Sequence, residues 1–477
     1  MEEINKLLKK ITCCKAVIFD MDGVIFNTNQ VHSKAFKETL DKLSEFFEYK
    51  KYGGMNTEQT LKEFFSDPEL LKKLKEEKQK KTLNLLKKAE IYRDVDRTIG
   101  LLHNLGIKTA VSTSASKERT YKMLNDFGLL DRFNQIVTAD DVNEAKPNPR
   151  IYEETLKRLN ISREEVIVIE DSESGIKAAK AAGIEVIALK HTSDESSIKE
   201  ANFILRDMSS LYAAIHAVYL KKKVSDKKPN ELERIAAVIP AAGKGIRLNF
   251  SGPKILYPIN DTTPLEIQYL KLRDFSDKII VIASPEGASE IEKYISKKGM
   301  DIEVKVIENS KGTADSVLSA LPLIGENEQV LVLWGDQIGI RKETIKNLLC
   351  KYDSKIYDFG LPVVIKKDPY IHLDLNEEGT VRKVCRKRFG DFMPEYGIND
   401  AGIFVAKNSE LLKVLKTMKQ EYISDSNAMC EEFDFLSVIP LFSSLDRLAL
   451  IPDIVDEKES IGMNTSEEAE FHKKIFQ

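Results

Sequence analysis

Residues 15–28 read KAVIFDMDGVIFNT, and this stretch decides the fold of the first half of the chain. AVIF (16–19) is apolar throughout, as expected for a strand buried on both faces of a parallel sheet. Asp20 and Asp22 follow the strand, and Gly23 lets the chain turn away. Two carboxylates on the same side of a strand end repel each other unless a cation joins them. The stretch therefore predicts a Mg²⁺ site with one carboxylate as nucleophile and the other as acid–base group.

Similar short apolar runs recur along the chain and alternate with longer helical patterns. The runs include 109–111, 166–169, 186–189, 235–239, 278–283, 304–307 and 329–334. Strands that alternate with helices form βαβ units and parallel sheets. We expect an α/β protein made of two doubly wound, Rossmann-like domains.

One charged segment interrupts the series and marks the expected domain boundary. Residues 221–233, KKKVSDKKPNELE, hold almost no large apolar residue and read as a linker. We expect one domain over 1–220 and a second over 234–477. Within the first, residues 30–95 carry lysine-rich helical patterns, which predict a helical cap inserted after the first strand. We interpret its lysines as a solvated helix face rather than a binding patch.

Composition narrows the class of protein. The 477 residues are 42% hydrophobic and 31% charged, enough to build full cores without disulfides. The net charge of −4 gives no sign of nucleic-acid or anionic-membrane binding. The five cysteines are scattered, which fits a reducing cytosol better than a disulfide or zinc framework. With no membrane-length apolar run and no signal-peptide pattern, we expect a cytoplasmic protein that acts on small molecules.

Further polar groups follow other strands of the first half. Ser112, Thr113 and Ser114 end the second main strand, Lys146 lies in the proline-rich loop AKPNP, and Glu170 with Asp171 ends VIVIED just before the glycine of a helix start. Open α/β sheets bind ligands at the carboxyl ends of their strands. The acidic pair after the first strand, the hydroxyl groups, the lysine and the second acidic pair are therefore expected to form one phosphoryl-transfer site.

This order resembles the haloacid dehalogenase superfamily, in its branch of β-phosphoglucomutases and small sugar-phosphate phosphatases, over about residues 12–215. The resemblance implies that Asp20 becomes phosphorylated and that Asp22 is the general acid–base group. It implies that Ser114, or Thr113 beside it, holds the phosphate and that Lys146 neutralises the transferred group. The implied Mg²⁺ ligands are Asp20, the backbone carbonyl of Asp22, Glu170 and Asp171.

The cap region bears on the choice between phosphatase and phosphomutase. Thr28 and His32 match substrate-side positions near the cap hinge, although His32 is equally interpreted as a plain helix residue. Thr57 stands where phosphoglucomutases carry an arginine, and Lys78 corresponds to the cap lysine only within a lysine-rich stretch. These departures favour a phosphatase and leave a phosphomutase as the alternative.

A second constellation opens the second half with IAAVIPAAGKGIRLNFSGPKILYPI (235–259). Small residues after the strand let backbone N–H groups approach phosphates closely. Arg247 and Lys254 supply positive charge for a triphosphate. The small residues that form the expected cradle are Ala241, Ala242, Gly243 and Gly245.

Two later features agree with a nucleotide site. Gly312 and Thr313 open a helix and give a second point of close approach. Asp336 ends the buried strand VLVLWGD and is expected to bind Mg²⁺. The reaction in which a phosphate oxygen attacks the α-phosphorus of a nucleoside triphosphate accumulates negative charge that Mg²⁺ offsets.

This pattern resembles the sugar-phosphate nucleotidyltransferases, and it is similar to their uridylyltransferase and cytidylyltransferase-like members over about residues 234–475. The resemblance implies a mixed, GT-A-like sheet in which Arg247 and Lys254 hold the phosphates. It implies that Asn464 is the second Mg²⁺ ligand beside Asp336. The implied acceptor-binding candidates are Asn399, Asp400, Glu432 and Asp434.

The donor and the acceptor are less defined. Glu308 lies four residues before Gly312, near where the family commonly has a glutamine. Its carboxylate accepts from the amino group of cytosine or guanine and repels the oxygen of uracil. We expect CTP, with UTP or dTTP as the next choice. DPYIHLDL (368–375) replaces the stretch with which the family contacts the sugar, so the acceptor need not be a hexosamine. Asp368 and His372 within it belong either to the acceptor pocket or to a polar face of a strand.

Together the two constellations predict a bifunctional enzyme. Its first half removes, or alternatively moves, a phosphate on a sugar or polyol phosphate, and its second half activates such a phosphate with a nucleotide for glycan precursors. Both halves are expected to use Mg²⁺. The rival readings are a sensor or scaffold with one inactive domain and a first half that hydrolyses the nucleotide product.

Overall fold

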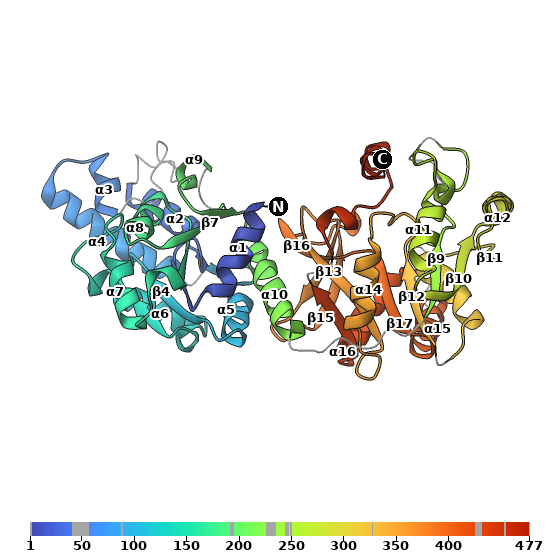
Figure 1. The fold of residues 1–477 in the computed structure, drawn as a ribbon. Coiled ribbons are helices and arrows are strands. Elements are labelled where there is room, and N and C mark those ends of the chain that lie inside the picture. Colours follow the sequence, from blue (N-terminus) through green and yellow to red (C-terminus); the bar gives the residue numbers. More distant parts are fainter. Residues whose placement is uncertain are drawn as a thin grey trace. The chain divides into compact units, whose positions relative to one another are not determined.

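A computed structural model describes most of the chain (Figure 1). The described residues are 2–40, 57–86, 89–190, 195–225, 235–243, 248, 250–326, 328–424, 432–452 and 455–476. The chain divides into a first compact unit, Met1–Tyr219 with Pro394–Tyr396, and a second that comprises Leu220–Met393 and Gly397–Gln477.

A six-stranded sheet forms the centre of the first unit, in the order β5-β4-β1-β6-β7-β8. Its strands are β1 (Ala16–Phe19), β4 (Lys108–Ser112), β5 (Gln135–Val137), β6 (Val166–Glu170), β7 (Glu185–Leu189) and β8 (Phe203–Leu205). All neighbours are parallel. Phe19 of β1 is level with Val111 of β4 and with Ile169 of β6, so the three strands end at the same height.

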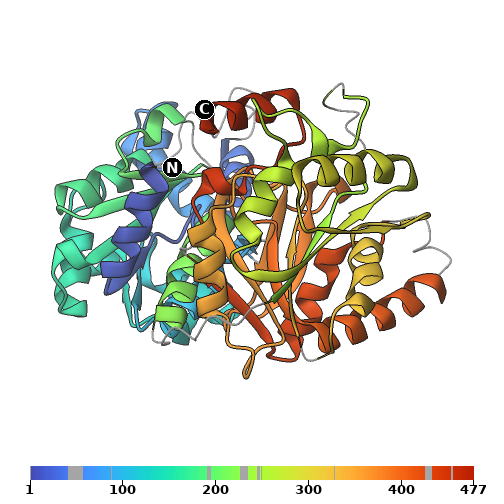
Figure 2. The same ribbon diagram turned by 45° about the vertical axis from the view of Figure 1, so that its right-hand side comes forward.

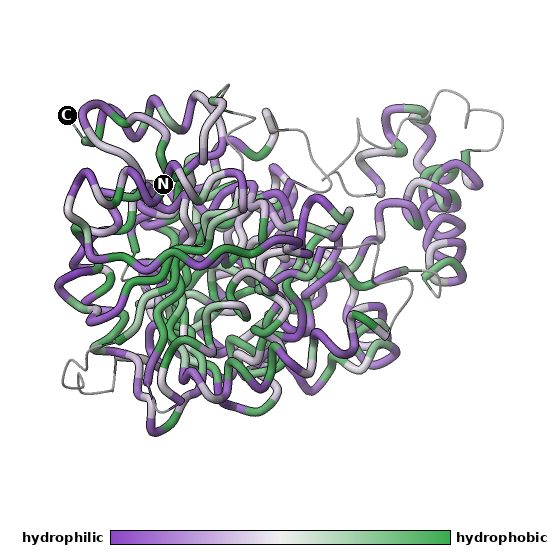
Figure 3. The backbone as a smooth tube through the Cα atoms, turned by 90° about the vertical axis from the view of Figure 1, so that its right-hand side faces the viewer, coloured by the Kyte–Doolittle hydropathy of each residue, from purple (hydrophilic) through white to green (hydrophobic). Residues whose placement is uncertain are grey.

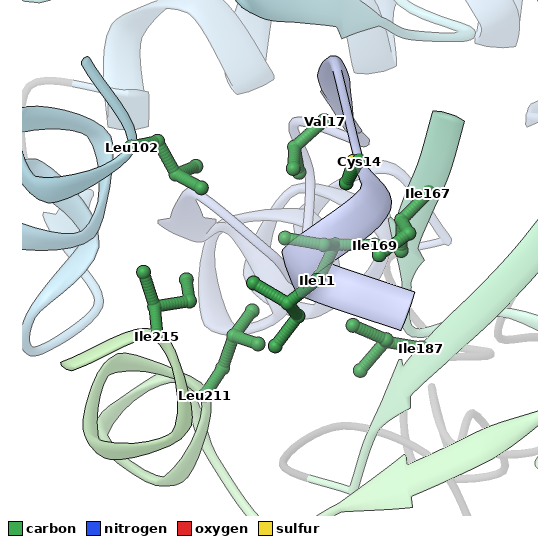
Figure 4. A pocket seen from close by; sticks show the side chains of 9 residues that line it. All are labelled: Ile11, Cys14, Val17, Leu102, Ile167, Ile169, Ile187, Leu211 and Ile215. Atoms are coloured by element: carbon green, nitrogen blue, oxygen red, sulfur yellow. The ribbon is translucent and has the colours of Figure 1, made fainter. Parts of the chain in front are cut away.

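Helices cover both faces of this sheet because its strands are apolar on both sides. Ala16 and Ile18 pack with side chains of α7 (Arg150–Leu159) and α8 (Glu173–Ala181). The other face is covered by α1 (Glu2–Cys13), α5 (Val95–Asn104) and α10 (Met208–Ser225), which enclose a small apolar pocket over β1, β6 and β7 (Figure 4). The lining side chains are Ile11, Cys14, Val17, Leu102, Ile167, Ile169, Ile187, Leu211 and Ile215.

One of two adjacent cysteines lines this pocket, and the two differ in solvent exposure. Cys14 is buried and its Sγ donates to the backbone oxygen of Ala16 at 2.8 Å, whereas Cys13 is exposed. Burial raises the pKa of the Cys14 thiol to about 11. Because the thiolate is the reactive form, we expect an aromatic disulfide reagent to modify Cys13 quickly in the native protein and Cys14 only after unfolding. Cys13→Ser should lower the number of fast-reacting thiols by one and Cys14→Ser should leave that number unchanged, and the reverse pattern would contradict this packing.

The predicted cap contains three described helices, α2 (Asn29–Leu40), α3 (Thr57–Lys62) and α4 (Pro68–Leu85). Phe36, Leu40, Leu61 and Leu71 form its small core. A short antiparallel pair, β2 (Phe26–Asn27) and β3 (Glu90–Ile91), joins the two chain segments at the start and end of the insert. The described cap lysines other than Lys78 are partly or fully exposed, in keeping with a solvated helix face.

An eight-stranded mixed sheet forms the centre of the second unit, in the order β11-β10-β9-β12-β17-β13-β16, with β18 paired to β13. The strands are β9 (Ile235–Pro240), β10 (Ser276–Ala283), β11 (Glu303–Val306), β12 (Gln329–Leu333), β13 (Phe359–Lys367), β16 (Tyr396–Asp400), β17 (Ile403–Lys407) and β18 (Leu448–Pro452). β9 to β12 are parallel, and β17 is antiparallel to β12 and β13. A separate hairpin pairs β14 (Ile371–Leu375) with β15 (Val381–Arg386).

Helices lie on both faces of this sheet as well (Figure 2). One face carries α11 (Pro264–Leu272), α12 (Pro285–Lys298) and α14 (Lys342–Lys351), and the other α13 (Thr313–Ala320), α15 (Asn408–Ser424) and α16 (Val438–Ser444). Phe359, Phe404, Phe435 and Phe442 pack together on the second face. The last helix, α17 (Ser466–Ile475), buries Ala469 against Ile259 and Ile338.

The expected α/β fold is confirmed, with a parallel Rossmann-like sheet first and a mixed sheet second. Apolar residues gather on the inner segments of the tube and polar residues on its outer ones (Figure 3). None of the described helices has both the length and the apolar character that crossing a membrane requires.

One predicted segment differs from the structure. Helix α10 continues to Ser225, so the first five residues of the predicted 221–233 linker are helical. Lysines 221–223 lie in or near its last turn, where cations interact favourably with the helix dipole. Residues 226–234 lie outside the described part of the chain.

Candidate active sites

Three buried carboxylates meet at the ends of β1 and β6. Asp20 follows β1, Glu170 is the last residue of β6, and Asp171 follows it. Oxygen atoms of all three lie within 4.8 Å of one another, and this is the one such group of potential ligands among the described residues. The parallel register that aligns Phe19 with Ile169 brings them together. Hard oxygen ligands packed this closely fit a Mg²⁺ ion.

Lys146 joins this carboxylate group from the loop before α7. Its Nζ lies 2.6 Å from Oδ1 of Asp20 and 2.7 Å from Oε1 of Glu170, and it donates to the backbone oxygen of Ser112 at 3.1 Å. Tyr152 donates its hydroxyl to Oε1 of Glu170 at 2.8 Å. The lysine side chain is almost fully buried. Its position suits a cation that neutralises a phosphoryl group on Asp20.

The charges in this group are strongly coupled. Burial raises the pKa of Asp20 well above its usual range, and Glu170 and Asp171 reinforce the shift that Lys146 opposes. Burial also favours a raised pKa for Glu170, but Lys146 outweighs it and the pKa of that carboxyl is lowered. The two carboxylates in turn hold the pKa of Lys146 well above its usual range, despite burial. One lysine among three buried carboxylates leaves negative charge that a divalent cation would balance.

Two glycines leave the room that these carboxylates need. A Cβ at Gly23 would lie 1.9 Å from Oδ2 of Asp171, and Gly23 also has a positive φ of +86°. A Cβ at Gly175, in the first turn of α8, would lie 1.7 Å from Oε1 of Glu170. Glycine at either position therefore keeps a carboxylate in place.

We expect Gly175→Ala to weaken Mg²⁺ activation of phosphate release about tenfold or more. Alanine ordinarily stabilises a helix relative to glycine, but here its methyl group displaces Glu170 from Lys146 and Tyr152, and such supporting contacts tune metal affinity by about 10- to 100-fold. The measurement is the Mg²⁺ concentration at half-maximal rate. Glu173→Ala, at an exposed position in the same helix turn, is the control and should leave that concentration unchanged. An unchanged value for Gly175→Ala would contradict the crowding seen here.

The structure distinguishes the two candidate phosphate-holding hydroxyls. Thr113 is buried, and its Oγ1 accepts from the backbone N–H of Ala115 at 3.1 Å. Ser114 is exposed after the end of β4. The exposed hydroxyl is available to a substrate, whereas that of Thr113 is engaged in the turn. The geometry thus supports Ser114 over Thr113.

The side chain of Asp22 lies apart from the carboxylate group. Its Oδ1 accepts from Thr28 at 2.7 Å and forms an ion pair with Arg119, while Nε2 of His32 lies 3.7 Å away. Burial alone would raise its pKa, but the Arg119 guanidinium, with His32 and Thr28, holds the pKa of Asp22 well below its usual range. The side chain of Asp22 is not part of the carboxylate group, and its backbone carbonyl, which the resemblance implies as a Mg²⁺ ligand, stays a prediction.

His32 and the cap lysine extend this second group. Nζ of Lys78, in α4, lies 3.0 Å from Nδ1 of His32 and donates to Oγ1 of Thr57 at 3.3 Å. Burial and then Arg119 lower the pKa of Lys78 to about 7. Burial and then Lys78 lower the pKa of His32 to about 4. His32 is therefore a buried residue of α2 that contacts Lys78 and Arg119, and its role toward the substrate stays a prediction.

Sequence reasoning missed two residues of this site, Arg119 and Tyr152. Arg119 lies in the first turn of α6 (Lys117–Asp126). A cation there runs against the helix dipole, and that unfavourable placement is the available signal. Nothing in the local pattern sets Tyr152 apart from an ordinary core residue of α7.

The second site gathers around Lys254 in the second unit. Nζ of Lys254 donates to Oδ2 of Asp336 and to Oδ1 of Asn464, both at 2.8 Å. Gly335, beside Asp336, approaches the end of β9 so closely that a Cβ would lie 2.8 Å from the backbone oxygen of Pro240. The structure thus brings together three predicted residues whose charge and oxygen atoms suit a nucleotide–Mg²⁺ complex.

The small-residue loop after β9 is described only in part. Ala241, Ala242 and Gly243 follow the strand, and the backbone N–H of Lys254 donates to the oxygen of Gly243 at 3.4 Å. Gly245 and Arg247 lie outside the described residues. Glu308 is exposed beyond the end of β11.

The helix start at Gly312 and Thr313 packs against the segment that holds Glu432. Gly312 has a φ of +151°, and a Cβ there would lie 2.4 Å from the oxygen of Phe433. Thr313 accepts from the N–H of Phe435 at 2.9 Å. Glu432 is paired with Arg388 at 2.7 Å. Asp434, in turn, is paired with Arg386 at 2.6 Å.

Asn399 and Asp400 lie at the end of β16, and a turn separates them from β17. Both are buried, and Oδ1 of Asn399 has no hydrogen-bond partner among the described residues. Burial raises the pKa of Asp400. His372 lies in β14 and its Nδ1 accepts from the N–H of Ile398 at 3.2 Å, while Asp368 precedes that strand. These positions leave the acceptor contacts as predictions.

Comparison with known proteins agrees with both halves. Residues 17–189 match the haloacid dehalogenase-like hydrolase family and residues 237–374 the MobA-like NTP transferase domain. A phosphorylated carbohydrates phosphatase of Thermotoga maritima is 32% identical over 192 residues, 36% of this chain and 83% of that protein. A pyrophosphatase, PpaX, of Halalkalibacterium halodurans is 29% identical over 207 residues, 41% of this chain and 94% of that protein.

The second half has relatives of another kind. The bifunctional protein GlmU of Buchnera aphidicola is 27% identical over 249 residues. The match spans 51% of this chain and about half of that protein, 51%. The chain is therefore an enzyme that belongs to the haloacid dehalogenase-like hydrolases through its N-terminal domain and joins to it a MobA-like NTP transferase domain.

Proposed function

We propose that the N-terminal domain is a Mg²⁺-dependent phosphatase of sugar or polyol phosphates that acts through an aspartyl phosphate. The observation that carries the proposal is the ion pair of Lys146 with Asp20, at 2.6 Å, beside the acidic pair Glu170 and Asp171. It pairs a nucleophile with a buried cation that balances the charge of an arriving phosphoryl group.

Phosphate release is proposed to proceed in two steps, formation and hydrolysis of the aspartyl phosphate. A carboxylate oxygen of Asp20 bonds to phosphorus as the bond to the leaving oxygen breaks. Asp22, which takes up a proton when substrate draws Arg119 away from it, gives that proton to the leaving oxygen. Ser114 and Lys146 hold the phosphoryl oxygens. Water then attacks the aspartyl phosphate, Asp22 takes its proton, and inorganic phosphate leaves. Mg²⁺, held by Asp20, Glu170, Asp171 and the backbone of Asp22, would supply charge neutralisation.

A phosphomutase is the alternative for this domain. Thr57 favours the phosphatase, because its neutral hydroxyl accepts from Lys78 and adds no charge of its own. The phosphatase relative of Thermotoga maritima supports the same choice. Thr28 and His32 are proposed to line the substrate side of the site, next to Asp22.

We propose that the C-terminal domain transfers a nucleotidyl group, with CTP as donor, to a sugar or polyol phosphate. A phosphate oxygen of the acceptor bonds to the α-phosphorus, and pyrophosphate leaves. Lys254 and Arg247 hold the phosphates, while Asp336 and Asn464 would hold Mg²⁺. The nucleotide-binding residues are Ala241, Ala242, Gly243, Gly245, Glu308, Gly312 and Thr313, and the acceptor candidates are Asn399, Asp400 and Glu432. Glu308 supports CTP over UTP or dTTP.

The pairing of the two domains supports one pathway that makes nucleotide-activated glycan precursors. A bisphosphate would lose one phosphate in the first domain and be activated at the other in the second. We place the enzyme in the cytoplasm, since Cys13, Cys14, Cys350 and Cys385 are free thiols.

The test incubates each nucleoside triphosphate with a library of sugar and polyol phosphates and Mg²⁺, reading pyrophosphate and phosphate separately. Pyrophosphate from one pair identifies the donor base and acceptor together. Phosphate released from nucleotide sugars but not from sugar phosphates would replace the proposed phosphatase with a hydrolase of the nucleotide product. Absence of pyrophosphate with every pair would overturn the proposed C-terminal substrates.

A further inference from the structure

Two polar side chains bind the backbone beside the predicted Mg²⁺ ligands of the second site. Lys271, in α11, donates from Nζ to the backbone oxygen of Ile338 at 2.5 Å. His472, in α17, is fully buried, and its Nε2 lies 3.0 Å from the backbone oxygen of Ile461. A carbonyl oxygen only accepts hydrogen bonds, so Nε2 of His472 carries the proton and donates it.

Each of these backbone oxygens is close in sequence to a predicted ligand. Ile338 comes two residues after Asp336, and Ile461 comes three residues before Asn464. The two segments also contact each other, because the N–H of Met463 donates to the backbone oxygen of Asp336 at 3.0 Å. The two hydrogen bonds from α11 and α17 therefore hold the segments from which Asp336 and Asn464 extend.

Neither side chain has an ionic partner that would explain its burial. Lys271 forms no ion pair within the described part of the chain, and burial lowers its pKa to about 8. Burial also lowers the pKa of His472, and its Nδ1 has no hydrogen-bond partner among the described residues. Burying such polar groups is costly unless they are hydrogen-bonded. Both side chains direct their hydrogen bonds to the backbone next to the predicted ligands.

The C-terminal helix links the two contacts. The rings of His472 and Phe476 are stacked with their centres 6.4 Å apart. The ammonium of Lys271 lies 5.2 Å from the ring centre of the same Phe476. Ile338 and Met463 bury their side chains in one small core, against which Phe476 packs. One packed unit thus supports both segments.

We propose that Lys271 and His472 are positioning residues of the nucleotidyl-transfer site, which keep Asp336 and Asn464 at the spacing that a Mg²⁺–nucleotide complex requires. The inference rests on the proposed C-terminal function, in which Asp336 and Asn464 would hold Mg²⁺. Two ligands from separate segments are preorganised only when both segments are fixed to a common support. Hydrogen bonds to the backbone provide that support without bringing another charge against the metal.

The Mg²⁺ dependence of pyrophosphate release tests the proposal. Lys271→Met and His472→Leu remove the two donors and keep side chains of similar size. We expect each to raise the Mg²⁺ concentration at half-maximal rate about tenfold or more, as supporting contacts of metal ligands do. The rate at saturating Mg²⁺ should stay close to that of the wild type. Lys271→Arg and His472→Gln keep a donor and should restore part of the Mg²⁺ affinity.

Matched controls separate positioning from general packing. Lys346→Met, in α14, and Lys474→Leu, in α17, make the same kinds of change at exposed positions. Both should keep the wild-type Mg²⁺ dependence. An equal loss of rate at every Mg²⁺ concentration, without rescue by the donor-keeping variants, would overturn the positioning role.

Hydrogen exchange without substrate separates failure of this inference from failure of the proposed function. The N–H of Met463 donates to the oxygen of Asp336, and that of Gln337 donates to the oxygen of Trp334 at 2.9 Å. In both donor-removing variants, peptides that contain these two amides should exchange about two- to tenfold faster, the range that loss of one hydrogen bond implies. Peptides from β10 should keep the wild-type rate.

The two possible failures then have different outcomes. Unchanged exchange at both segments would overturn the positioning role even if the wild-type enzyme releases pyrophosphate. Faster exchange at both segments, with no pyrophosphate from any pair of substrates, would support the positioning role and reject the proposed transfer reaction.

Discussion

Replacing Asp20 with asparagine is expected to reduce phosphate release from every substrate by about 10⁴-fold or more, a loss typical of removing a nucleophile. The amide cannot form the acyl phosphate that the proposed route requires. The side chain keeps its shape, and Lys146 keeps its contact with Glu170 at 2.7 Å. Initial rates of phosphate release, with circular dichroism as a check of folding, measure the effect.

Two controls make this result specific. Asp131→Asn changes an exposed aspartate of the same domain and should leave the rate unchanged. Pyrophosphate release by the Asp20→Asn protein should also persist, because the second site shares none of these residues. Mass spectrometry of acid-quenched wild-type protein should show a phosphorylated peptide that contains Asp20. A substantial rate in folded Asp20→Asn protein would argue against covalent catalysis at this carboxylate.

Replacing Asp336 with alanine is expected to lower pyrophosphate release about 10³-fold, since a metal ion that neutralises charge in the transition state contributes several kcal/mol. The change removes a predicted Mg²⁺ ligand. It also takes away the carboxylate partner of Lys254, leaving Asn464 as its remaining contact within this group. Pyrophosphate formation at saturating nucleotide, measured over a range of Mg²⁺ concentrations, reports the loss.

The N-terminal activity is the internal control for this variant. Phosphate release should be unchanged, and Asp301→Ala, at an exposed position of the same domain, should retain both activities. Loss of both activities in folded Asp336→Ala protein would contradict two independent sites. Asp20→Asn should therefore lose only phosphate release, and Asp336→Ala should lose only pyrophosphate release.

Much of the fold and of both sites was predictable because their signals are local. Apolar runs of three to six residues identified the strands, and polar residues directly after them identified the strand ends. In a parallel sheet those ends meet at one edge, so Asp20 and Glu170 were expected to be neighbours before any register was known. The helix start at Thr313 was equally local. The start of the linker was harder to predict from local sequence. Helix α10 continues to Ser225, through lysines that stabilise the end of a helix.

The sequence by itself determined the α/β class and predicted a polar site at the strand ends of each half, because strand periodicity and strand-end residues are local properties. Only the tertiary structure decided which distant side chains join them. Arg119 reaches Asp22 across 97 residues, Lys78 reaches His32 across 46, and Lys254 reaches Asn464 across 210. These contacts depend on tertiary packing, in which α4, for example, lies against α2 and α3 of the cap. No spacing along the chain encodes that packing, because it arises when separate elements bury their apolar faces together.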